Sequence, residues 1–382
     1  MEYKKIGELT TVITGGTPAT NIAEYWDTGD IPWLQSGCCQ NCDVDRAEKY
    51  ITQTGYENSN TKMMPPDTVM IALTGATAGK IGYLKFDACG NQSITGILPC
   101  DVLDQRYLFY YLLSKRAQIL SDCIGGAQPH ISQGYVKDIL IPVLPIKEQK
   151  EIAQKVIYID SLISLRKQQL AKLDEAVKAR FVEMFGDIAL NPFGWEKDNL
   201  GAVCDVRDGT HDSPKYYETG YPLVTSKNVT GGKVDLTDCS LICEGDFNKI
   251  NERSKVDIGD IIMPMIGTVG KPVIVDIEPN FAIKNVSLIK LKANSRVLNI
   301  YIRALLQSDY FDEAVLSKVR GGTQKFISLG DIRNLAVLIP PLNLQQQFAT
   351  FVEQTDKSKL AIQKSLDKLE VLKKSLMQQY FG

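Results

Sequence analysis

One stretch of the chain occurs twice, and this repetition constrains the fold more than any other feature. Residues 144–156 read LPIKEQKEIAQKV, and residues 340–352 read PPLNLQQQFATFV. In both, a proline precedes a polar run with a glutamine, and apolar residues then follow at helical spacing. The equivalent positions share one spacing of 196 residues: Pro145 and Pro341, Gln149 and Gln345, Ile152 and Phe348, Val156 and Val352.

The repeat extends upstream through the chain. GGAQPHIS at 125–132 matches GGTQKFIS at 321–328, and IGELTTVITGGT at 6–17 resembles LGAVCDVRDGTH at 200–211. PDTVMIALTGATAGK, ending at Lys80, resembles GDIIMPMIGTVGK, ending at Lys271. A tandem of this period predicts two similar globular units, each followed by a tail. The predicted boundaries are a first domain at 1–144, a first tail at 145–186, a second domain at 187–340 and a second tail at 341–382.

The tails carry a heptad pattern, in which apolar residues alternate steps of four and three. Proline suits a helix start and Gly186 suits a stop, so each tail is expected to form one helix of about 35 to 40 residues, roughly 50 to 60 Å long. The residues expected at the helix interface are Ile152, Val156, Ile159, Ile163, Leu170 and Leu173 in the first tail, and Phe348, Val352, Ile362, Leu366 and Leu369 in the second.

A helix with such a seam cannot bury it alone, and each tail has a partner of the same register in the same chain. Closed pairing of two similar helices about a pseudo-twofold axis predicts an antiparallel coiled coil. The two globular units are then expected at opposite ends of a helical spacer. The alternative, in which each tail packs on an unrelated surface, would need no shared register.

Within each unit the pattern is mixed. TVMIAL, KIGYLKF and SITGILP in the first unit, and DIIMPMI, KPVIVDI and VSLIKLK in the second, are typical of strands. DQRYLFYYLLSKRAQIL and NIYIRALLQSDYFDEAVL, which follow them, are typical of amphipathic helices. The predicted fold class is therefore α+β, with two repeated α+β domains separated by two long antiparallel helices.

Composition excludes several classes of protein. Apolar residues make up 44% and charged residues 23%, which is the composition of a globular chain. No apolar run approaches the roughly 20 residues of a membrane span, and the N-terminus lacks a secretory signal, so we expect a cytoplasmic protein with no membrane contact. The net charge of −2 argues mildly against nucleic acid, although net charge does not decide what one face binds.

The chain shows no catalytic signature. GATAGKI at 75–81 has three residues between its glycines and isoleucine after the lysine, whereas a phosphate-binding loop needs four and Ser or Thr, so we expect a strand-to-strand turn. No Asn-Pro-Pro-aromatic run of a methyltransferase is present. CCQNC at 38–42 raises the possibility of a zinc site, but only two histidines accompany nine cysteines, which favours free thiols and no bound metal.

The duplicated order of a variable unit, a GGxQ loop, a PxxxQ junction and a long helix closely resembles the specificity subunit of type I restriction-modification systems. The resemblance covers essentially the whole chain. It implies two target recognition domains that read a bipartite double-stranded DNA target, with the helices as spacer and platform. It implies two DNA-methyltransferase subunits and endonuclease or translocase subunits as partners, which would direct adenine methylation or restriction. S-adenosylmethionine, ATP and Mg are then expected in those partners and no cofactor in this chain, which is not an enzyme by itself.

The candidate DNA contacts are polar or glycine positions in the repeated loops. Glycines let backbone approach a phosphate, and a glutamine amide can reach a phosphate or an adenine edge. A tight turn leading into the next strand would explain the glycines equally well, and a buried turn histidine would explain His211. The candidates in the first unit are Thr14, Gly15, Thr17, Thr77, Lys80, Gly125, Gly126, Gln128 and His130, and those in the second are Asp208, Thr210, His211, Thr268, Lys271, Gly321, Gly322, Thr323, Gln324 and Lys325.

A second class of function also fits the repeat. A two-headed coiled-coil adaptor that holds two proteins apart, without binding DNA, would account for the acidic pI of about 5.9 and the absence of catalytic motifs. It would not explain why the two units share a frame but differ in their loops. A third class, an enzyme, would require zinc at the cysteine cluster.

Overall fold

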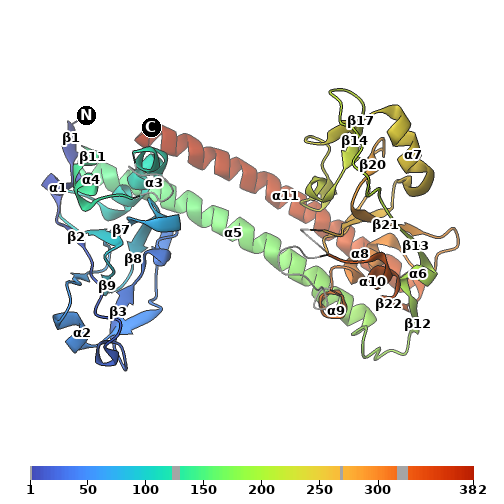
Figure 1. Cartoon of the computed structure of the whole chain (residues 1–382), viewed down its shortest axis with the longest axis horizontal. Coiled ribbons are helices and arrows are strands. Elements are labelled where there is room, and N and C mark those ends of the chain that lie inside the picture. The colour runs from blue at the N-terminus through green and yellow to red at the C-terminus, as the bar shows by residue number, and fades with distance from the viewer. Residues whose placement is uncertain (1, 123–129, 267–269, 316–325) are drawn as a thin grey trace. The chain divides into compact units, whose positions relative to one another are not determined.

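The computed structural model describes residues 2–122, 130–266, 270–315 and 326–382. It divides the chain into two compact units, the first made of residues 1–166 and 365–382 and the second of residues 167–364. Each unit combines sheets with helices, and each contains part of both long helices (Figure 1). The prediction of two repeated α+β domains is confirmed.

A five-stranded sheet forms the centre of the first unit. Its order is β2 (Val12–Thr14), β10 (Ile94–Ile97), β7 (Val69–Ala72), β8 (Ile81–Leu84) and β4 (Cys42–Val44). Every residue of β7, β8 and β10 is buried, which explains their continuous apolar sequences. A second sheet orders β5 (Lys49–Ile51), β3 (Ile31–Leu34), β9 (Ala88–Gly90) and β6 (Met63–Met64), with the short helix α2 (Gln53–Glu57) nearby in sequence.

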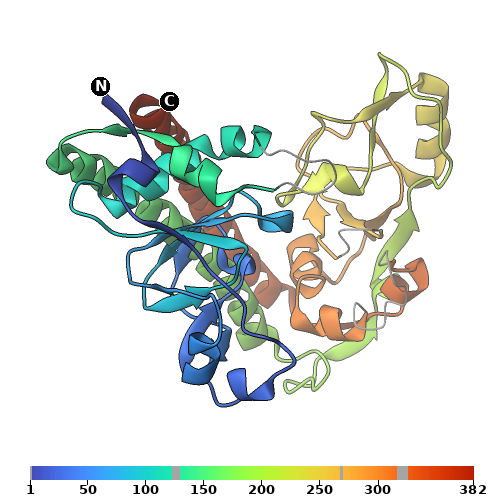
Figure 2. The same cartoon turned by 60° about the vertical axis from the view of Figure 1, so that its left-hand side comes forward.

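The second unit repeats this plan with fewer strands. Its main sheet orders β13 (Cys204–Asp208), β21 (Val286–Leu291), β18 (Ile261–Pro264) and β19 (Val273–Ile274). A separate lobe, yellow in Figures 1 and 2, contains β17 (Ser240–Ile242), β14 (Tyr221–Val224), helix α7 (Glu244–Ser254) and the hairpin β15 (Val229–Thr230) and β16 (Lys233–Val234). The strand β20 (Ala282–Ile283) pairs with β14 in this lobe.

Helices after the sheets close each core. Asp104 caps α3 (Gln105–Ser121) by accepting a hydrogen bond from the Tyr107 amide at 2.9 Å. In the second unit the single helix predicted over 299–316 is wrong: α8 (Asn299–Leu305) ends and α9 (Asp309–Ala314) begins anew. The reason is Ser308, whose hydroxyl accepts from the Phe311 amide at 3.4 Å and so starts a second helix.

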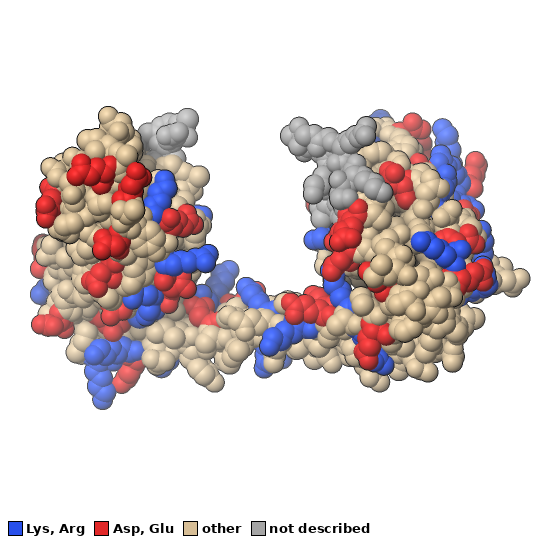
Figure 3. Space-filling view, turned by 90° about the horizontal axis from the view of Figure 1, so that it is seen from below, with Lys and Arg blue, Asp and Glu red and all other residues tan. Residues whose placement is uncertain are grey.

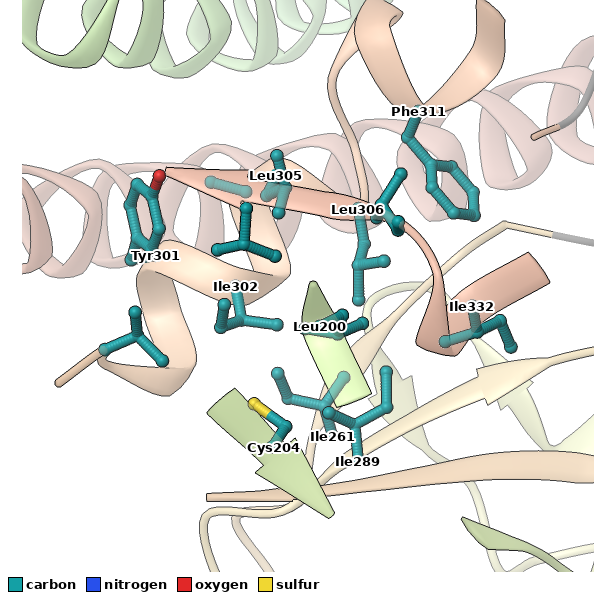
Figure 4. Close-up of a cluster of buried hydrophobic side chains, with 14 of the residues drawn as sticks. Leu200, Cys204, Ile261, Ile289, Tyr301, Ile302, Leu305, Leu306, Phe311 and Ile332 are labelled. Carbon is teal, nitrogen blue, oxygen red and sulfur yellow. The ribbon is translucent and has the colours of Figure 1, made fainter. Parts of the chain in front are cut away.

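The core of the second unit lies between its main sheet and these helices. Side chains from β13, β18 and β21 meet those of α8 and α9 in one buried cluster (Figure 4). The cluster also includes residues from the end of one long helix and the start of the other. Both long helices therefore form part of this core. Members drawn in the figure include Leu200, Cys204, Ile261, Ile289, Tyr301, Ile302, Leu305, Leu306, Phe311 and Ile332.

In the repeated GGxQxxIS motif, the isoleucine and the serine have structural roles. Ile131 and Ile327 are buried, and their amides donate to the carbonyls of Leu73 and Met265 at 2.8 and 3.0 Å. The serines that follow cap the next helices, α4 (Gln133–Asp138) and α10 (Leu329–Arg333). Those helices lead to β11 (Leu140–Val143) and β22 (Ala336–Ile339), which pair antiparallel with the first strands of the units, β1 (Glu2–Lys5) and β12 (Glu196–Asn199). Short helices α1 (Ile6–Leu9) and α6 (Leu200–Val203) follow those first strands.

The two tails form the long helices α5 (Ile146–Phe185) and α11 (Leu342–Phe381). In the first unit Asp160 of α5 lies 2.5 Å from Lys373 near the end of α11, and in the second unit Asp174 of α5 lies 2.6 Å from Lys359 nearer its start. The two helices therefore run antiparallel, as predicted. The predicted interface residues are buried or half-buried: Ile152, Val156, Ile159, Ile163, Leu170, Leu173, Phe348, Val352, Ile362, Leu366 and Leu369.

Each long helix begins in one unit and ends in the hydrophobic core of the other unit. Phe381 of α11 packs against Tyr107 and Tyr111 of α3, with ring centroids 5.3 and 6.2 Å apart. Phe185 of α5 packs against Tyr301 of α8 at 4.9 Å and against Phe348 of α11 at 5.4 Å. Packing explains the repeated FG ending, because the two phenylalanines occupy equivalent positions in aromatic clusters of the two cores.

The repeated glutamine connects each globular unit to the long helix that follows it. Gln149 and Gln345 are both fully buried. Gln149 accepts from the Asp104 amide and donates to the carbonyls of Val102 and Leu144. Gln345 makes the equivalent three bonds, to the Leu298 amide and to the carbonyls of Arg296 and Pro340, at 2.8 to 2.9 Å. One side chain thus satisfies three backbone groups at the point where the helix begins.

We expect Gln345→Leu to lower the free energy of unfolding of the second unit by about 3 kcal/mol, because one buried amide and two carbonyls lose their partners. Urea denaturation followed by circular dichroism measures the change. The matched control is Gln346→Leu, at the exposed neighbouring position of the same helix, which should shift the unfolding midpoint little. Equal stabilities of the two variants would contradict the role given to Gln345.

Candidate nucleic-acid interface

The candidate contacts of the first unit that the structure describes gather at one end of its main sheet. There β2 and β7 end while β10 and β8 begin, since β10 runs antiparallel to both β2 and β7 and β7 antiparallel to β8. Thr14, at the end of β2, lies 3.1 Å from Thr95 between hydroxyl oxygens. The Thr17 hydroxyl donates to Gln92 at 2.5 Å, and the Thr74 hydroxyl donates to Ser93 at 2.9 Å. This end of the sheet is therefore a polar surface ordered by its own hydrogen bonds.

Lys80 and Thr77 lie in the connection between β7 and β8. The segment Gly75–Thr77 is a short 3-10 turn between antiparallel strands, which confirms the prediction of a strand-to-strand turn. The Lys80 ammonium donates to Oε1 of Gln40 at 2.6 Å, and the Asn41 side chain accepts from the Ile81 amide at 3.0 Å. The CCQNC stretch thus holds this lysine at the polar end of the sheet.

Gly15 and Gly209 have a structural explanation. A Cβ on Gly15 would lie 1.9 Å from the carbonyl oxygen of Gly90, and one on Gly209 would lie 2.3 Å from that of Ile283. The chain passes so close to its own backbone that only glycine fits. These equivalent glycines are required by packing at the strand ends, whatever else approaches them.

In the second unit Asp208 is the last residue of β13, and Thr210 and His211 follow it at the equivalent sheet end. Asp208 is buried, and its carboxylate binds Arg253 of α7 and, at 2.8 Å, the Nε2 atom of His211. The other ring nitrogen of His211 lies 3.0 Å from Oδ1 of Asn285. The bond to Asp208, followed by that to Asn285, raises the pKa of His211 above its ordinary value. His211 itself is exposed, so the buried turn histidine considered from sequence is wrong.

Other candidates lie beside these groups or outside the described residues. His130 pairs with Thr74 through a β-bridge and is exposed, as is Lys271, while Thr210 is half-buried and bridges to Lys284. The equivalent of His130, Phe326, bridges to Ile266. The candidates Gly125, Gly126, Gln128, Thr268, Gly321, Gly322, Thr323, Gln324 and Lys325 lie outside the residues that the structure describes.

Sequence reasoning missed several polar residues of these sheet ends: Gln40, Gln92, Ser93, Lys284 and Asn285. Gln40 stands in the CCQNC stretch, which was considered only for metal binding, and the other four stand in no conspicuous motif. Alignment of the two repeats could have found Asn285, because Asn91 and Asn285 occupy equivalent places after the same kind of strand, at the spacing of 194 seen for Gly15 and Gly209. Their placement beside the candidates depends on strand pairing, which one sequence does not display.

The surface carries charges of both signs. On the face drawn in Figure 3, acidic and basic side chains are interspersed over each unit rather than separated into one-sign patches. Several cations are paired with carboxylates, such as Arg106 with Asp43 at 2.6 Å and Lys290 with Asp257 at 2.8 Å. DNA contact at such a surface depends on individual groups at the sheet ends more than on long-range attraction.

Three further observations concern the described residues. Among those residues, no three His, Cys, Asp or Glu side chains are grouped so as to hold a metal ion. In the cysteine stretch, hydrogen bonding with Cys39 lowers the pKa of Cys38, and the same contact raises the pKa of the buried Cys39. No described helix has the length and apolar character needed to cross a membrane.

The comparisons with known proteins agree with this architecture. The family model of the type I restriction modification DNA specificity domain matches residues 1–175 and again residues 192–374. The chain therefore belongs to this family, as a specificity subunit with two such domains. It is 27% identical to the type I restriction enzyme MjaIX specificity subunit of Methanocaldococcus jannaschii, over 98% of this chain and 91% of that protein. It is 23% identical to the EcoKI specificity subunit of Escherichia coli, over 91% of this chain and 80% of that protein.

A solved structure shows the same fold. The crystal structure of the type I restriction-modification system S subunit from M. genitalium aligns with a TM-score of 0.60 at 16% identity. The alignment covers 100% of this chain and 96% of that chain. The fold is thus retained although most residues differ, which fits a frame set by a few buried positions.

We expect Gly15→Ala to lower the free energy of unfolding of the first unit by about 2 to 4 kcal/mol, because the added Cβ overlaps a backbone carbonyl. Gly37→Ala is the matched control in the same unit, since a Cβ there meets nothing within 4 Å. Thermal unfolding measures both. If Gly15→Ala kept full stability and lost only DNA binding, Gly15 would act at the DNA and the packing explanation would be wrong.

Proposed function

We propose that this specificity subunit is a non-catalytic DNA reader, in which each unit recognises one half of a bipartite double-stranded target. The duplicated architecture carries the proposal. Equivalent buried positions recur in both units, as Gln149 and Gln345 do, while the exposed positions at the sheet ends differ, as His130 and Phe326 do. Two readers on one frame suit two half-sites of different sequence.

The partners proposed are two DNA-methyltransferase subunits and endonuclease or translocase subunits. Such partners would bring S-adenosylmethionine, ATP and Mg, and the complex would methylate adenine or cut DNA. The long helices supply support, because they expose large apolar side chains to solvent, Tyr158 and Leu165 on α5 and Leu360 and Val371 on α11, at 53 to 69% exposure. Apolar side chains of this size on an otherwise polar helix suit protein contact.

The non-DNA-binding adaptor is not favoured by the family to which the chain belongs. A gel shift of the assembled methyltransferase complex on double-stranded DNA at increasing salt separates the two functions. A DNA reader gives a complex whose affinity falls with salt as phosphate contacts are lost. No shift at any salt would leave the adaptor as the better proposal.

Exchanging residues 1–144 for the same block of a relative should change one half of the methylated target and leave the other half unchanged. Each unit has its own core, so the two readouts are separable. Methylome sequencing of cells that carry the hybrid reports both halves. A hybrid that is folded and active but alters both halves would rule out modular reading.

Lengthening both helices should lengthen the non-specific gap between the half-sites. Each of α5 and α11 is one continuous helix of 40 residues with an anchor in each unit. Seven residues inserted near Gln168, with seven at the facing turn of α11, preserve the heptad phase and add roughly 10 Å. We expect about three extra base pairs between unchanged half-sites. Insertion of four residues, which shifts the seam, is the control. An unchanged gap in an active enzyme would mean that the helices do not set the distance.

A further inference from the structure

The segment after β13, residues 211–217, is unlike its counterpart in the first unit. It reads HDSPKYY and exposes two tyrosines, Tyr216 at 52% and Tyr217 at 43%. The Lys215 ammonium lies 5.6 Å from the centre of the Tyr217 ring. Exposed aromatic rings with a lysine among them suit contact with duplex DNA, since the rings can pack on sugars and base edges and the cation can pair with phosphate.

This segment is held at its start, middle and end. The Thr210 amide donates to Ile283 at 3.0 Å, the Lys284 ammonium donates to the Ser213 hydroxyl at 2.8 Å, and the Tyr217 amide donates to Leu241 at 2.9 Å. Each bond joins the segment to a different part of the second unit: β20, the β20–β21 turn and β17. A loop fixed in this way loses little conformational freedom when it binds a ligand.

His211 controls the start of the segment through three elements. Its ring nitrogens face Asp208 at the end of β13 and Asn285 before β21, and Asp208 also binds Arg253 of α7. Both neighbours present oxygen atoms to the ring, and only the doubly protonated imidazolium donates to both. With both nitrogens engaged within the protein, His211 holds the segment rather than reading a base itself.

The charge of this region is balanced apart from His211. The cations are Lys215 within the segment, Lys284, which binds Ser213, and Arg253, which binds Asp208. The carboxylates are Asp208, which binds His211, Asp212 within the segment and Glu218 directly after it. Three positive groups therefore offset three negative ones. Protonation of His211 leaves the region with a net positive charge, and its loss leaves the region neutral, which matters for a ligand made of phosphates.

We propose that residues 211–217 contact DNA at the half-site read by the second unit, with Tyr216, Tyr217 and Lys215 as contacting residues and His211 as the positioning residue. This inference rests on the proposed function and adds to it the element that reads one half-site. In the first unit the equivalent stretch has no charged side chain and is tied down by Trp33 and Trp26, which donate to the carbonyls of Gly16 and Ala19. The proposed contribution of residues 211–217 to DNA binding is therefore specific to the second half-site.

The sign of the pH dependence follows from the contacts of His211. Hydrogen bonds to Asp208 and Asn285 hold the pKa of His211 above its ordinary value. Its protonated form therefore supports the loop fully at mildly acidic pH, and this support is lost as the pH rises through the raised pKa. Binding at the second half-site weakens over that interval, while discrimination at the first half-site stays constant.

The test uses the complete methyltransferase complex and a duplex carrying the target found by methylome mapping, with companion duplexes altered in either half-site. Tyr216→Ala with Tyr217→Ala should weaken binding on the order of tenfold and reduce discrimination against second-half mismatches only. Tyr50→Ala is the matched control, since this tyrosine is 44% exposed on β5 of the first unit. Unchanged affinity and discrimination in the double variant would overturn the proposal.

The histidine is tested by titration of binding from about pH 6 to pH 8.5. His211→Gln should bind as weakly as the wild type does at high pH and show no pH dependence, with discrimination at the first half-site retained. Lys215→Ala, at an exposed position, keeps the fold intact and should lower the salt dependence by about one ion. A wild-type affinity that does not change with pH would remove the role of His211. Failure of the wild-type complex to bind the duplex at all would count instead against the proposed function.

Discussion

The buried glutamine at the start of each long helix is the contact on which the rest of the structure depends. Gln149 and Gln345 each satisfy one amide and two carbonyls where a globular unit meets its long helix. Buried backbone groups without partners are costly, so an apolar residue of similar size would leave this joint unstable. These contacts fix where the helix begins.

Each long helix is held at its far end as well as at its start. Phe185 and Phe381 provide the second anchor by entering the aromatic clusters around Tyr301 and Tyr107. Those tyrosines donate to the carbonyls of Leu338 and Pro142, in the strands that precede the helices. The same core therefore receives the end of one helix and supports the start of the other. Neither unit's core is complete without residues from both long helices.

The two units share this frame and differ where strands end. Among the described residues, the repeated glycines that approach backbone, the serines that cap helices and the buried glutamines have structural roles. The sheet ends hold neutral hydroxyls, amides and one lysine in the first unit, and a charged cluster around His211 in the second. Surface groups at strand ends can change without disturbing the core, because they lie beyond the last ladder hydrogen bonds. This separation lets one frame carry two different readers.

The sequence alone determined the duplication, the α+β class, the two helices and their antiparallel pairing, because heptad spacing and strand patterns are local and a repeat of 196 residues is visible without coordinates. It did not determine the break between α8 and α9, where the cap at Ser308 outweighs a continuous helical pattern. Nor did it distinguish Gly15 as a packing residue from Gly15 as a DNA contact, or bring Lys284 and Asn285 beside His211. Only tertiary structure decided these points, since each depends on strands distant in sequence that pair and set side chains together at one sheet end.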